Sequence, residues 1–260
     1  MPKRLPPMDE LVVVDVGNTR LRMAVCDDDG LRDLVHASTL DPGSWRGAIE
    51  RTWSHTTPGA RRAIVVCSVR PAESLRLAAL VCEICGVEPL FVGEDVPLPL
   101  ELDVENPDEV GIDRVCSAAA AYERVGAACA VASFGTAITI DCVSRDGRFL
   151  GGAILPGMQL SCDALHQRAA QLPQIQAAAP EGPFGRSTRA AIINGVAYGA
   201  VGALREIVER YATELHEWPE LLVTGGNGEM IAELADFVDA HVAELCLVGI
   251  GLAYRKAAAP

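Results

Sequence analysis

Positive charge and aromatic side chains are both scarce in this 260-residue chain. Lys and Arg number 22 against 35 Asp and Glu, which gives a formal net charge of −13, and Phe, Trp and Tyr make up 5% of the residues. Nucleic-acid binding needs a basic surface that displaces counterions, and adhesion to anionic membranes needs the same sign of charge. The charge balance therefore argues against both classes. A bound phosphate must be held locally, by turn amides, a few Arg or Lys side chains and Mg²⁺.

Several common motifs are also missing. The five histidines show no metal-ligand spacing, and there is no P-loop, dinucleotide fingerprint or Ser-His-Asp set. The nine cysteines are odd in number and no secretory h-region precedes them. Seven of them sit inside apolar runs, and we interpret these as buried, reduced thiols: Cys26, Cys67, Cys116, Cys129, Cys142, Cys162 and Cys246. Cys82-x-x-Cys85 lies in an expected helix without a second pair nearby, which disfavours a metal or redox role. Since no run reaches the roughly 18–20 apolar residues of a membrane span, we expect a soluble, cytoplasmic protein.

A glycine turn between β-branched runs occurs twice. The first copy reads Leu-Val-Val-Val-Asp-Val-Gly-Asn-Thr over residues 11–19, and the second reads Ala-Val-Ala-Ser-Phe-Gly-Thr over residues 130–136. Each is followed by an alternating strand, which predicts a hairpin. Such a turn leaves backbone N–H groups and a Thr hydroxyl available to an anion. Two phosphate-holding hairpins half a chain apart indicate two similar lobes with a nucleotide between them.

The order of predicted elements repeats in the same way. In the first half, strands are expected at 11–16, 20–26, 31–38, 62–68 and 88–92, with helices at 43–55 and 73–85. After a proline-rich loop at 93–107 and a helix at 107–122, strands are expected at 128–133, 137–143, 148–154 and 220–224. The remaining helices are expected at 157–169, 187–216, 227–235 and 249–257. The pattern β-β-β-α-β-α-β, run twice, predicts an α/β fold of two similar actin-like (ribonuclease H-like) lobes. Each lobe is a mixed sheet flanked by helices, the lobes border a cleft, and they span residues 1–106 and 107–260.

Asp15 and Asp113 are the two candidate catalytic carboxylates. Asp15 ends a strand just before Gly17, where a carboxylate can organise Mg²⁺ beside a nucleotide's phosphates. Capping of local backbone groups is the alternative for Asp15, and the adjoining Gly-Asn-Thr favours the metal. Asp113 lies in the first turn of the helix that follows Asn106-Pro107. There it either complements the helix dipole or accepts a proton from an attacking hydroxyl. The residues alone favour neither role over the other.

The order of motifs resembles the type III pantothenate kinases of the acetate kinase/sugar kinase/actin superfamily. The matching segments cover nearly the whole chain from 11 to 255: Asp15-Val-Gly-Asn-Thr19, Asn106-Pro107-x-x-Val-Gly111-Ile-Asp113-Arg114, Phe134-Gly-Thr-Ala-Ile-Thr139-Ile-Asp141, Gly151-Gly-x-x-x-Pro156-Gly157, Gly185-x-x-Thr188 followed by Gly195, and Thr224-Gly-Gly226. Each motif is modest alone, and six in this order make a specific set.

The resemblance implies an enzyme that phosphorylates pantothenate with ATP, the first step of coenzyme A biosynthesis, as a cytoplasmic homodimer. It implies Asp113 as the catalytic base, a divalent metal near Asp15, and a monovalent cation, K⁺ or NH₄⁺. ATP contacts are implied at Asp15, Val16, Gly17, Asn18, Thr19, Arg20, Leu21, Arg22 and Thr136. Pantothenate contacts are implied at Gly111, Ile112, Asp113, Arg114 and Thr188. The long helix at 187–216 is a candidate dimer interface along Ala190, Ile193, Ala197, Val201 and Leu204, with ordinary core packing as the equal alternative.

The chain departs from the family pattern at three positions. Ser133 stands where the family has an Asp that helps to hold the monovalent cation, and serine offers an oxygen without the charge. Val104 stands where the family tends to place a Tyr that contacts pantothenate, and Ile112 replaces an Ala. These changes support an alternative function as a catalytically weak homologue that binds its ligand as an accessory or regulatory protein. A kinase for another small hydroxylated acid is a further alternative.

Overall fold

A computed structural model describes residues 5–259 of the chain. The described residues form two compact units: unit 1 is built from residues 5–101, 105–120 and 245–259, and unit 2 from Leu102–Val104 and Ala121–Glu244. The predicted split at residue 106 groups the chain differently, because it assigns the last helix and the start of the central helix to the second lobe. The last helix packs on strands of unit 1, through contacts that no local pattern reveals.

Unit 1 contains a five-stranded mixed sheet. In chain order its elements are β1 (Glu10–Val16), β2 (Arg20–Asp27), β3 (Gly30–Ser38), η1 (Pro42–Ser44), α1 (Trp45–Ser54), β4 (Arg62–Ser68), α2 (Pro71–Cys85), β5 (Leu90–Phe91), η2 (Pro107–Glu109), the first part of α3 (Ile112–Val125) and α7 (Leu245–Ala258). The strand order is β3-β2-β1-β4-β5. β1 pairs antiparallel with β2 and parallel with β4.

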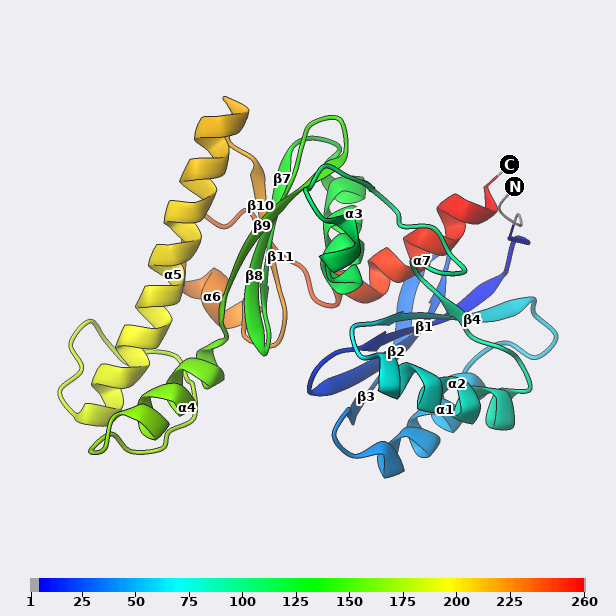
Figure 1. Cartoon of the computed structure of the whole chain (residues 1–260), viewed down its shortest axis with the longest axis horizontal. Helices are drawn as coiled ribbons and strands as arrows, with labels where there is room; N and C mark the ends of the chain where they lie inside the picture. The colour runs from blue at the N-terminus through cyan, green and yellow to red at the C-terminus, as the bar shows by residue number, and fades with distance from the viewer. Residues whose placement is uncertain (1–4, 260) are drawn as a thin grey trace. The chain divides into compact units, whose positions relative to one another are not determined.

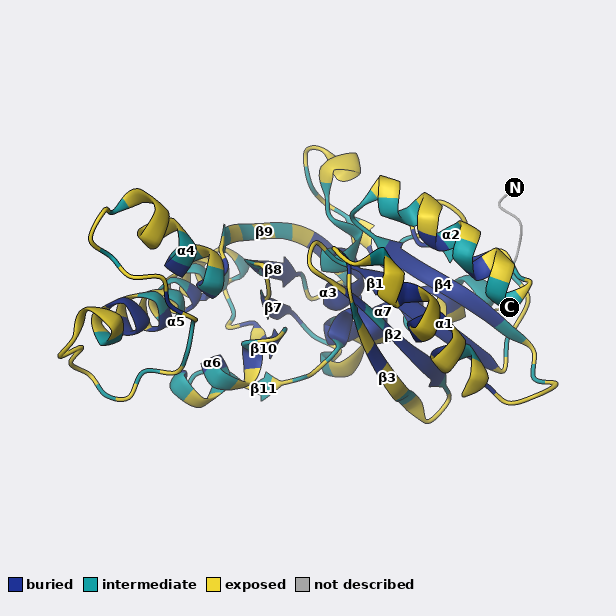
Figure 2. Cartoon of the chain, turned by 90° about the horizontal axis from the view of Figure 1, so that it is seen from below, coloured by how far each residue is buried: buried dark blue, intermediate teal, exposed yellow. Residues whose placement is uncertain are grey.

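Both faces of the unit 1 sheet are covered, which explains why β1 is an unbroken apolar run. Val12, Val14 and Val16 point to a core shared with α1 and α2, and Leu11 and Val13 point to a core shared with α7. α7 lies on the face opposite α1 and α2 (Figure 1). Figure 2 shows β1 as buried throughout and β4 as buried except at its two ends, while the outer sides of α1 and α2 are exposed.

Unit 2 contains the second sheet. Its elements are β6 (Glu101–Leu102, whose first residue is grouped with unit 1), the end of α3, β7 (Cys129–Phe134), β8 (Ala137–Val143), β9 (Arg148–Pro156), α4 (Met158–Arg168), α5 (Thr188–Leu215), β10 (Glu220–Thr224), α6 (Gly228–Leu234) and β11 (Ala240–His241). The strand order is β11-β10-β7-β8-β9-β6. β7 pairs antiparallel with β8 and parallel with β10, as β1 does with β2 and β4. The predicted duplication is confirmed, with β6 added at one edge.

The element predictions hold for the long strands and helices and fail at short ones. The stretch 93–107, predicted to lack regular structure, contains β6 and the start of η2. The helix predicted from 107 is interrupted, because Val110 is extended with ψ of 127° before α3 begins at Ile112. α7 begins at Leu245 rather than 249, and β11 was not predicted.

α5 is the longest helix of the described residues, with 28 residues. The Ser187 hydroxyl accepts a hydrogen bond from the Ala190 N–H at 3.2 Å and caps its first turn, and His216 ends it in a left-handed conformation. Ala197 and Leu204 on its predicted apolar side are fully buried in the core of unit 2. Core packing is therefore the role that the structure gives these two residues.

α5 is also the one described helix that is long and apolar enough to cross a membrane, contrary to our expectation that no segment would qualify. A third of its most apolar window is buried inside the protein. A single such helix is weak evidence, because core helices of soluble proteins meet the same criterion.

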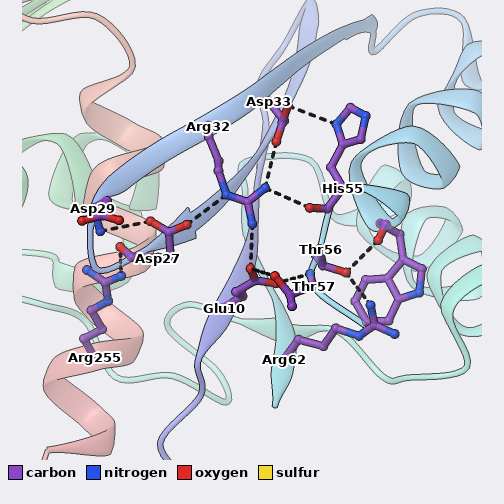
Figure 3. Close-up of polar contacts among 11 residues, drawn as sticks. Glu10, Asp27, Asp29, Arg32, Asp33, His55, Thr56, Thr57, Arg62 and Arg255 are labelled. Carbon is purple, nitrogen blue, oxygen red and sulfur yellow. Dashed lines mark hydrogen bonds and ion pairs between the residues drawn. The ribbon is translucent and has the colours of Figure 1, made fainter. Parts of the chain in front are cut away.

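A polar network stabilises the first residue of β1, Glu10, at the end of the strand opposite the glycine turn (Figure 3). The guanidinium of Arg32 donates to Glu10 at 2.6 Å, to Asp27 at 2.9 Å and to Asp33 at 2.9 Å. Glu10, 7% exposed, also accepts from the backbone N–H and the hydroxyl of Thr57, both at 2.7 Å. Burial raises the pKa of Glu10, but these hydrogen bonds and the charge of Arg32 outweigh it and hold the pKa below its ordinary value.

Candidate active site

The β1–β2 turn is held tightly by its own backbone. The Gly17 N–H donates to the Arg20 carbonyl at 3.0 Å, and the Thr19 carbonyl accepts from the Thr39 N–H at 3.1 Å. The Asn18 carbonyl accepts from the Arg70 guanidinium at 2.9 Å, at the start of α2. The Gly17 amide is therefore used within the turn rather than left available to an anion. The side chains that the turn presents to solvent are those of Asn18, Thr19 and Arg20.

Asp15 is 2% exposed and faces Arg22 across the β1–β2 pair. The Arg22 guanidinium donates twice to one carboxylate oxygen of Asp15, once through Nε at 3.0 Å and once through a terminal nitrogen. We predicted that Arg22 could reach a bound anion, and in the structure it pairs with Asp15. The pairing fixes the orientation of this carboxylate in the interior of unit 1.

Asp113 lies in the first turn of α3, where the structure leaves it partly exposed. Its Oδ1 accepts from the Arg114 N–H at 3.0 Å, and its carbonyl accepts from the Ser117 hydroxyl at 2.8 Å. Asp113 and Asp15 both belong to unit 1. The structure thus places the two predicted carboxylates in the same unit, although 97 residues lie between them in sequence.

Three buried cysteines of unit 1 belong to one core cluster near Asp15. Cys67 on β4 pairs directly with Asp15 on β1, Cys116 lies on α3, and Cys246 lies on α7. Contact with the Cys116 thiol, together with burial, raises the pKa of Cys67 well above its ordinary value. Contact with Cys67 and burial do the same to Cys246. These groups were predicted to be buried thiols, as the structure shows, but not to converge on Asp15.

The β7–β8 turn of unit 2 accepts hydrogen bonds from the residues that precede two helices. The Gly135 N–H is used inside the turn, where it donates to the Ala137 carbonyl at 3.0 Å. The Thr136 carbonyl accepts from the Gly157 N–H at 3.2 Å, just before α4. The Phe134 carbonyl accepts from the Asn227 N–H at 3.1 Å, just before α6. The Thr136 side chain itself is exposed.

Thr224 opens one of the motifs named from the sequence, but no role was predicted for its side chain. It pairs with Ser133 across the parallel β10–β7 ladder and is 3% exposed. Its hydroxyl oxygen is buried without a hydrogen-bond partner. Such an orphaned oxygen is costly unless something else binds it. The only sequence signal was that Thr224 precedes the Gly225-Gly226 pair, where Gly225 has φ of 91°.

Thr188 lines a cavity of about 830 Å³ in unit 2. The cavity lies along α4 and α5 and is mainly apolar, with Ser161, Arg168 and Thr188 as its hydroxyl and charged side chains. Its volume suits a small molecule. Of the other predicted pantothenate contacts, Gly111, Ile112, Asp113 and Arg114 belong to unit 1. Val104 lies in unit 2 close to Gly151.

The fold and the paired glycine turns define the actin-like class to which many ATP-dependent sugar kinases belong. A ROK family glucokinase from Streptomyces griseus, solved with glucose and AMPPNP, matches with a TM-score of 0.51 at 15% identity, over 95% of this chain and 99% of that one. A Baf family transcriptional activator from Campylobacter jejuni matches with a TM-score of 0.60 at 19% identity, over 94% of this chain and 98% of that one. At these identities the likeness shows the fold alone.

The sequence comparisons identify the protein family within this fold class. The family model for type III pantothenate kinase matches residues 11–210. A type III pantothenate kinase from Anaeromyxobacter sp. (strain Fw109-5) is 36% identical over 254 residues, which cover 95% of this chain and 99% of that protein. The chain belongs to the type III pantothenate kinase family.

Proposed function

We propose that this chain transfers the γ-phosphoryl group of ATP to the primary hydroxyl of pantothenate, the first step of coenzyme A biosynthesis. The observation that carries the proposal is the family match, and the placement of Asp15 and Asp113 in the same unit supports it. A kinase needs one group that takes the proton of the attacking hydroxyl and others that stabilise charge on the phosphates.

Asp113 is the proposed catalytic base. It is partly exposed at the start of α3, and its backbone position is fixed by the helix, so its carboxylate can accept the hydroxyl proton as the oxygen attacks phosphorus. Gly111, Ile112 and Arg114 beside it are proposed to bind pantothenate. In unit 2, Thr188 is proposed to bind the same substrate at the wall of its cavity.

Asp15 is the proposed divalent-metal residue. Mg²⁺ is usually held by one or two carboxylates plus substrate phosphates, and the single buried carboxylate of Asp15 fits that pattern. When bound, the metal neutralises charge on the phosphates. Arg22 is proposed to orient the Asp15 carboxylate. The rest of the β1–β2 turn, residues 16–21, and Thr136 of the β7–β8 turn are proposed to contact ATP.

Ser133 and Thr224 are the proposed ligands of a monovalent cation, K⁺ or NH₄⁺. The unpartnered hydroxyl oxygen of Thr224 fits such an ion, because neutral oxygens can replace its hydration shell. Neither residue carries a charge, so we expect weak binding. We further propose that the enzyme is a cytoplasmic homodimer.

The alternative of an accessory protein that binds ligand without turnover rests on Ser133 and Val104. A coupled ADP-release assay with ATP, Mg²⁺ and pantothenate, with and without K⁺ or NH₄⁺, separates the two functions when calorimetry is run beside it. Turnover that requires pantothenate supports the kinase. Binding of ATP or pantothenate without ADP release would support the accessory protein instead.

A further inference from the structure

Three side chains meet in the interior of unit 1, and two of them have no role in the proposed reaction. One oxygen of Asp15 and the sulfurs of Cys67 and Cys246 all lie within 4.8 Å of one another. Cys116 belongs to the same buried cluster as the two cysteines, but its sulfur is not one of the convergent atoms. The four residues are at most 4% exposed. Within the described residues, Asp15, Cys67 and Cys246 are the one group of three potential metal ligands whose atoms converge in this way.

The backbone fixes this arrangement. Asp15 and Cys67 are partners in the β1–β4 ladder. Cys116 comes from α3 and Cys246 from the first turn of α7, and these helices approach closely: a Cβ on Gly249 would lie 1.9 Å from the Cys116 carbonyl oxygen. The three convergent ligands therefore come from three separate elements, β1, β4 and α7. The cluster exists only in the folded protein, where it is already assembled.

The donor atoms favour a thiophilic cation over Mg²⁺. Zn²⁺ binds thiolates in a tetrahedron, with Zn–S of about 2.3 Å and hence sulfurs about 3.8 Å apart, and carboxylate oxygen is an accepted ligand beside them. Mg²⁺ prefers oxygen ligands and water. The exclusion of solvent is also typical of closed zinc sites. Ordinary core packing explains a buried cysteine, and Arg22 pairs with one oxygen of Asp15, but neither explains why a carboxylate oxygen converges with two thiols.

We propose that Asp15, Cys67 and Cys246 form a site for a thiophilic divalent cation such as Zn²⁺, and that its occupancy inhibits the kinase. The inhibition rests on the proposed function: an Asp15 oxygen that binds the thiophilic cation is withdrawn from the metal–nucleotide complex. Each coordinating thiol gives its proton to solvent when the cation binds.

Binding is tested on the reduced, metal-free, full-length protein by titration with Cd²⁺, followed through the charge-transfer absorption of cadmium thiolates. We expect about one Cd²⁺ per chain, displaced by Zn²⁺, since both are d¹⁰ cations that select thiolates. Cys67→Ala and Cys246→Ala should each weaken the binding at least tenfold. Cys129→Ala, which removes an equally buried thiol from unit 2, should leave it unchanged. Circular dichroism confirms that each variant is folded.

The two parts of the proposal fail separately. Absence of the absorption, or the same absorption in Cys67→Ala, Cys246→Ala and the parent protein, would overturn the site whatever the kinase does. The kinase itself is measured on metal-free enzyme by ADP release with Mg²⁺. Zn²⁺ should then abolish most of this activity in the parent and in Cys129→Ala, and far less of it in Cys246→Ala. Stoichiometric, cysteine-dependent binding with full activity would overturn the inhibition.

Discussion

The two glycine-turn hairpins share a topology and differ in chemistry. Two residues before the turn glycine, β1 carries Asp15 and β7 carries Ser133. The antiparallel partner of Asp15 is Arg22, whereas that of Ser133 is Thr139. At the same place, β1–β2 forms a partly buried ion pair, and β7–β8 presents only hydroxyl groups.

The parallel neighbours differ as well. Cys67 adjoins Asp15 on β4, and Thr224 adjoins Ser133 on β10. Strand order and register therefore fix where a side chain stands, while the residue type decides what it can bind. On this comparison we propose that unit 1 supplies the charged groups of phosphoryl transfer, while unit 2 offers neutral oxygens and a cavity.

The largest effect is expected in unit 1 at Asp113. Asp113→Asn removes the proposed base, and general-base catalysis contributes about 10²- to 10⁴-fold, so kcat should fall by that factor. ATP affinity should stay within about threefold, because the residue is proposed to act on the alcohol and not on the nucleotide. ADP release gives kcat, and calorimetry gives the affinity. Asp108→Asn, an exposed acid of the preceding η2, is the matched control and should keep normal turnover.

A direct test of the comparison removes the functional group at each of the two equivalent positions. Asp15→Asn should lower kcat/KM for Mg·ATP by about 10²-fold, the usual cost of a preorganised electrostatic group. Ser133→Ala should lower it by less than about tenfold, since a neutral hydroxyl contributes less than a charge. Steady-state kinetics against Mg·ATP measures both. Equal losses at the two positions would show that the hairpins are functionally alike.

A substitution at Gly225 tests how much the stability of unit 2 depends on the close approach of the Gly225 loop to β7. Its φ is 91°, and a Cβ there would lie 2.7 Å from the Phe134 backbone nitrogen. Gly225→Ala should therefore reduce the free energy of unfolding by about 2–3 kcal/mol, from backbone strain and displacement of the turn. Urea denaturation measures this loss. Gly202→Ala on α5 meets nothing within 4 Å and should instead stabilise the helix by roughly 1 kcal/mol. A neutral Gly225→Ala would mean that the loop does not press on β7.

The smallest effect concerns the other end of β1, where Glu10 and Arg32 form a second carboxylate–guanidinium pair. Because hydrogen bonds to a charged group contribute about 1.5–3 kcal/mol, Glu10→Gln should lower the free energy of unfolding near pH 7 while kcat stays unchanged. The pKa of Glu10 is lowered by folding, so the carboxylate stabilises the fold above about pH 4.5, the ordinary value for Glu.

This stabilisation is lost as the pH falls through the lower pKa of the folded state. The difference between the parent and Glu10→Gln should therefore shrink below about pH 4.5. Urea denaturation between pH 3 and 7 follows it. A difference that stays constant over this range would contradict the lowered pKa.

Local sequence patterns were sufficient to predict the repeated features of the fold. The β-branched run at β1, the turns at Gly17 and Gly135, and the long α5 all follow from periodicity and turn residues that lie within a few positions of one another. The family motifs also led to Asp15 and Asp113. What they could not supply was contact between distant segments.

The missed features all depend on such contacts. The two-residue strand β11 exists only because β10 pairs with it. α7 joins unit 1 through its packing on β1, and the thiol cluster draws on residues from 15 to 246. The unpartnered hydroxyl of Thr224 depends on which atoms surround it. Propensity and spacing carry no information about any of these.

The central claim, that this chain phosphorylates pantothenate, is tested most directly by identifying the product. Purified protein is incubated with ATP, Mg²⁺ and pantothenate, and the product is examined by mass spectrometry and ³¹P NMR. We predict a phosphate monoester on the primary hydroxyl of pantothenate, formed in equal amount to ADP. Unmodified pantothenate, with ATP either intact or hydrolysed to free phosphate, would contradict the account.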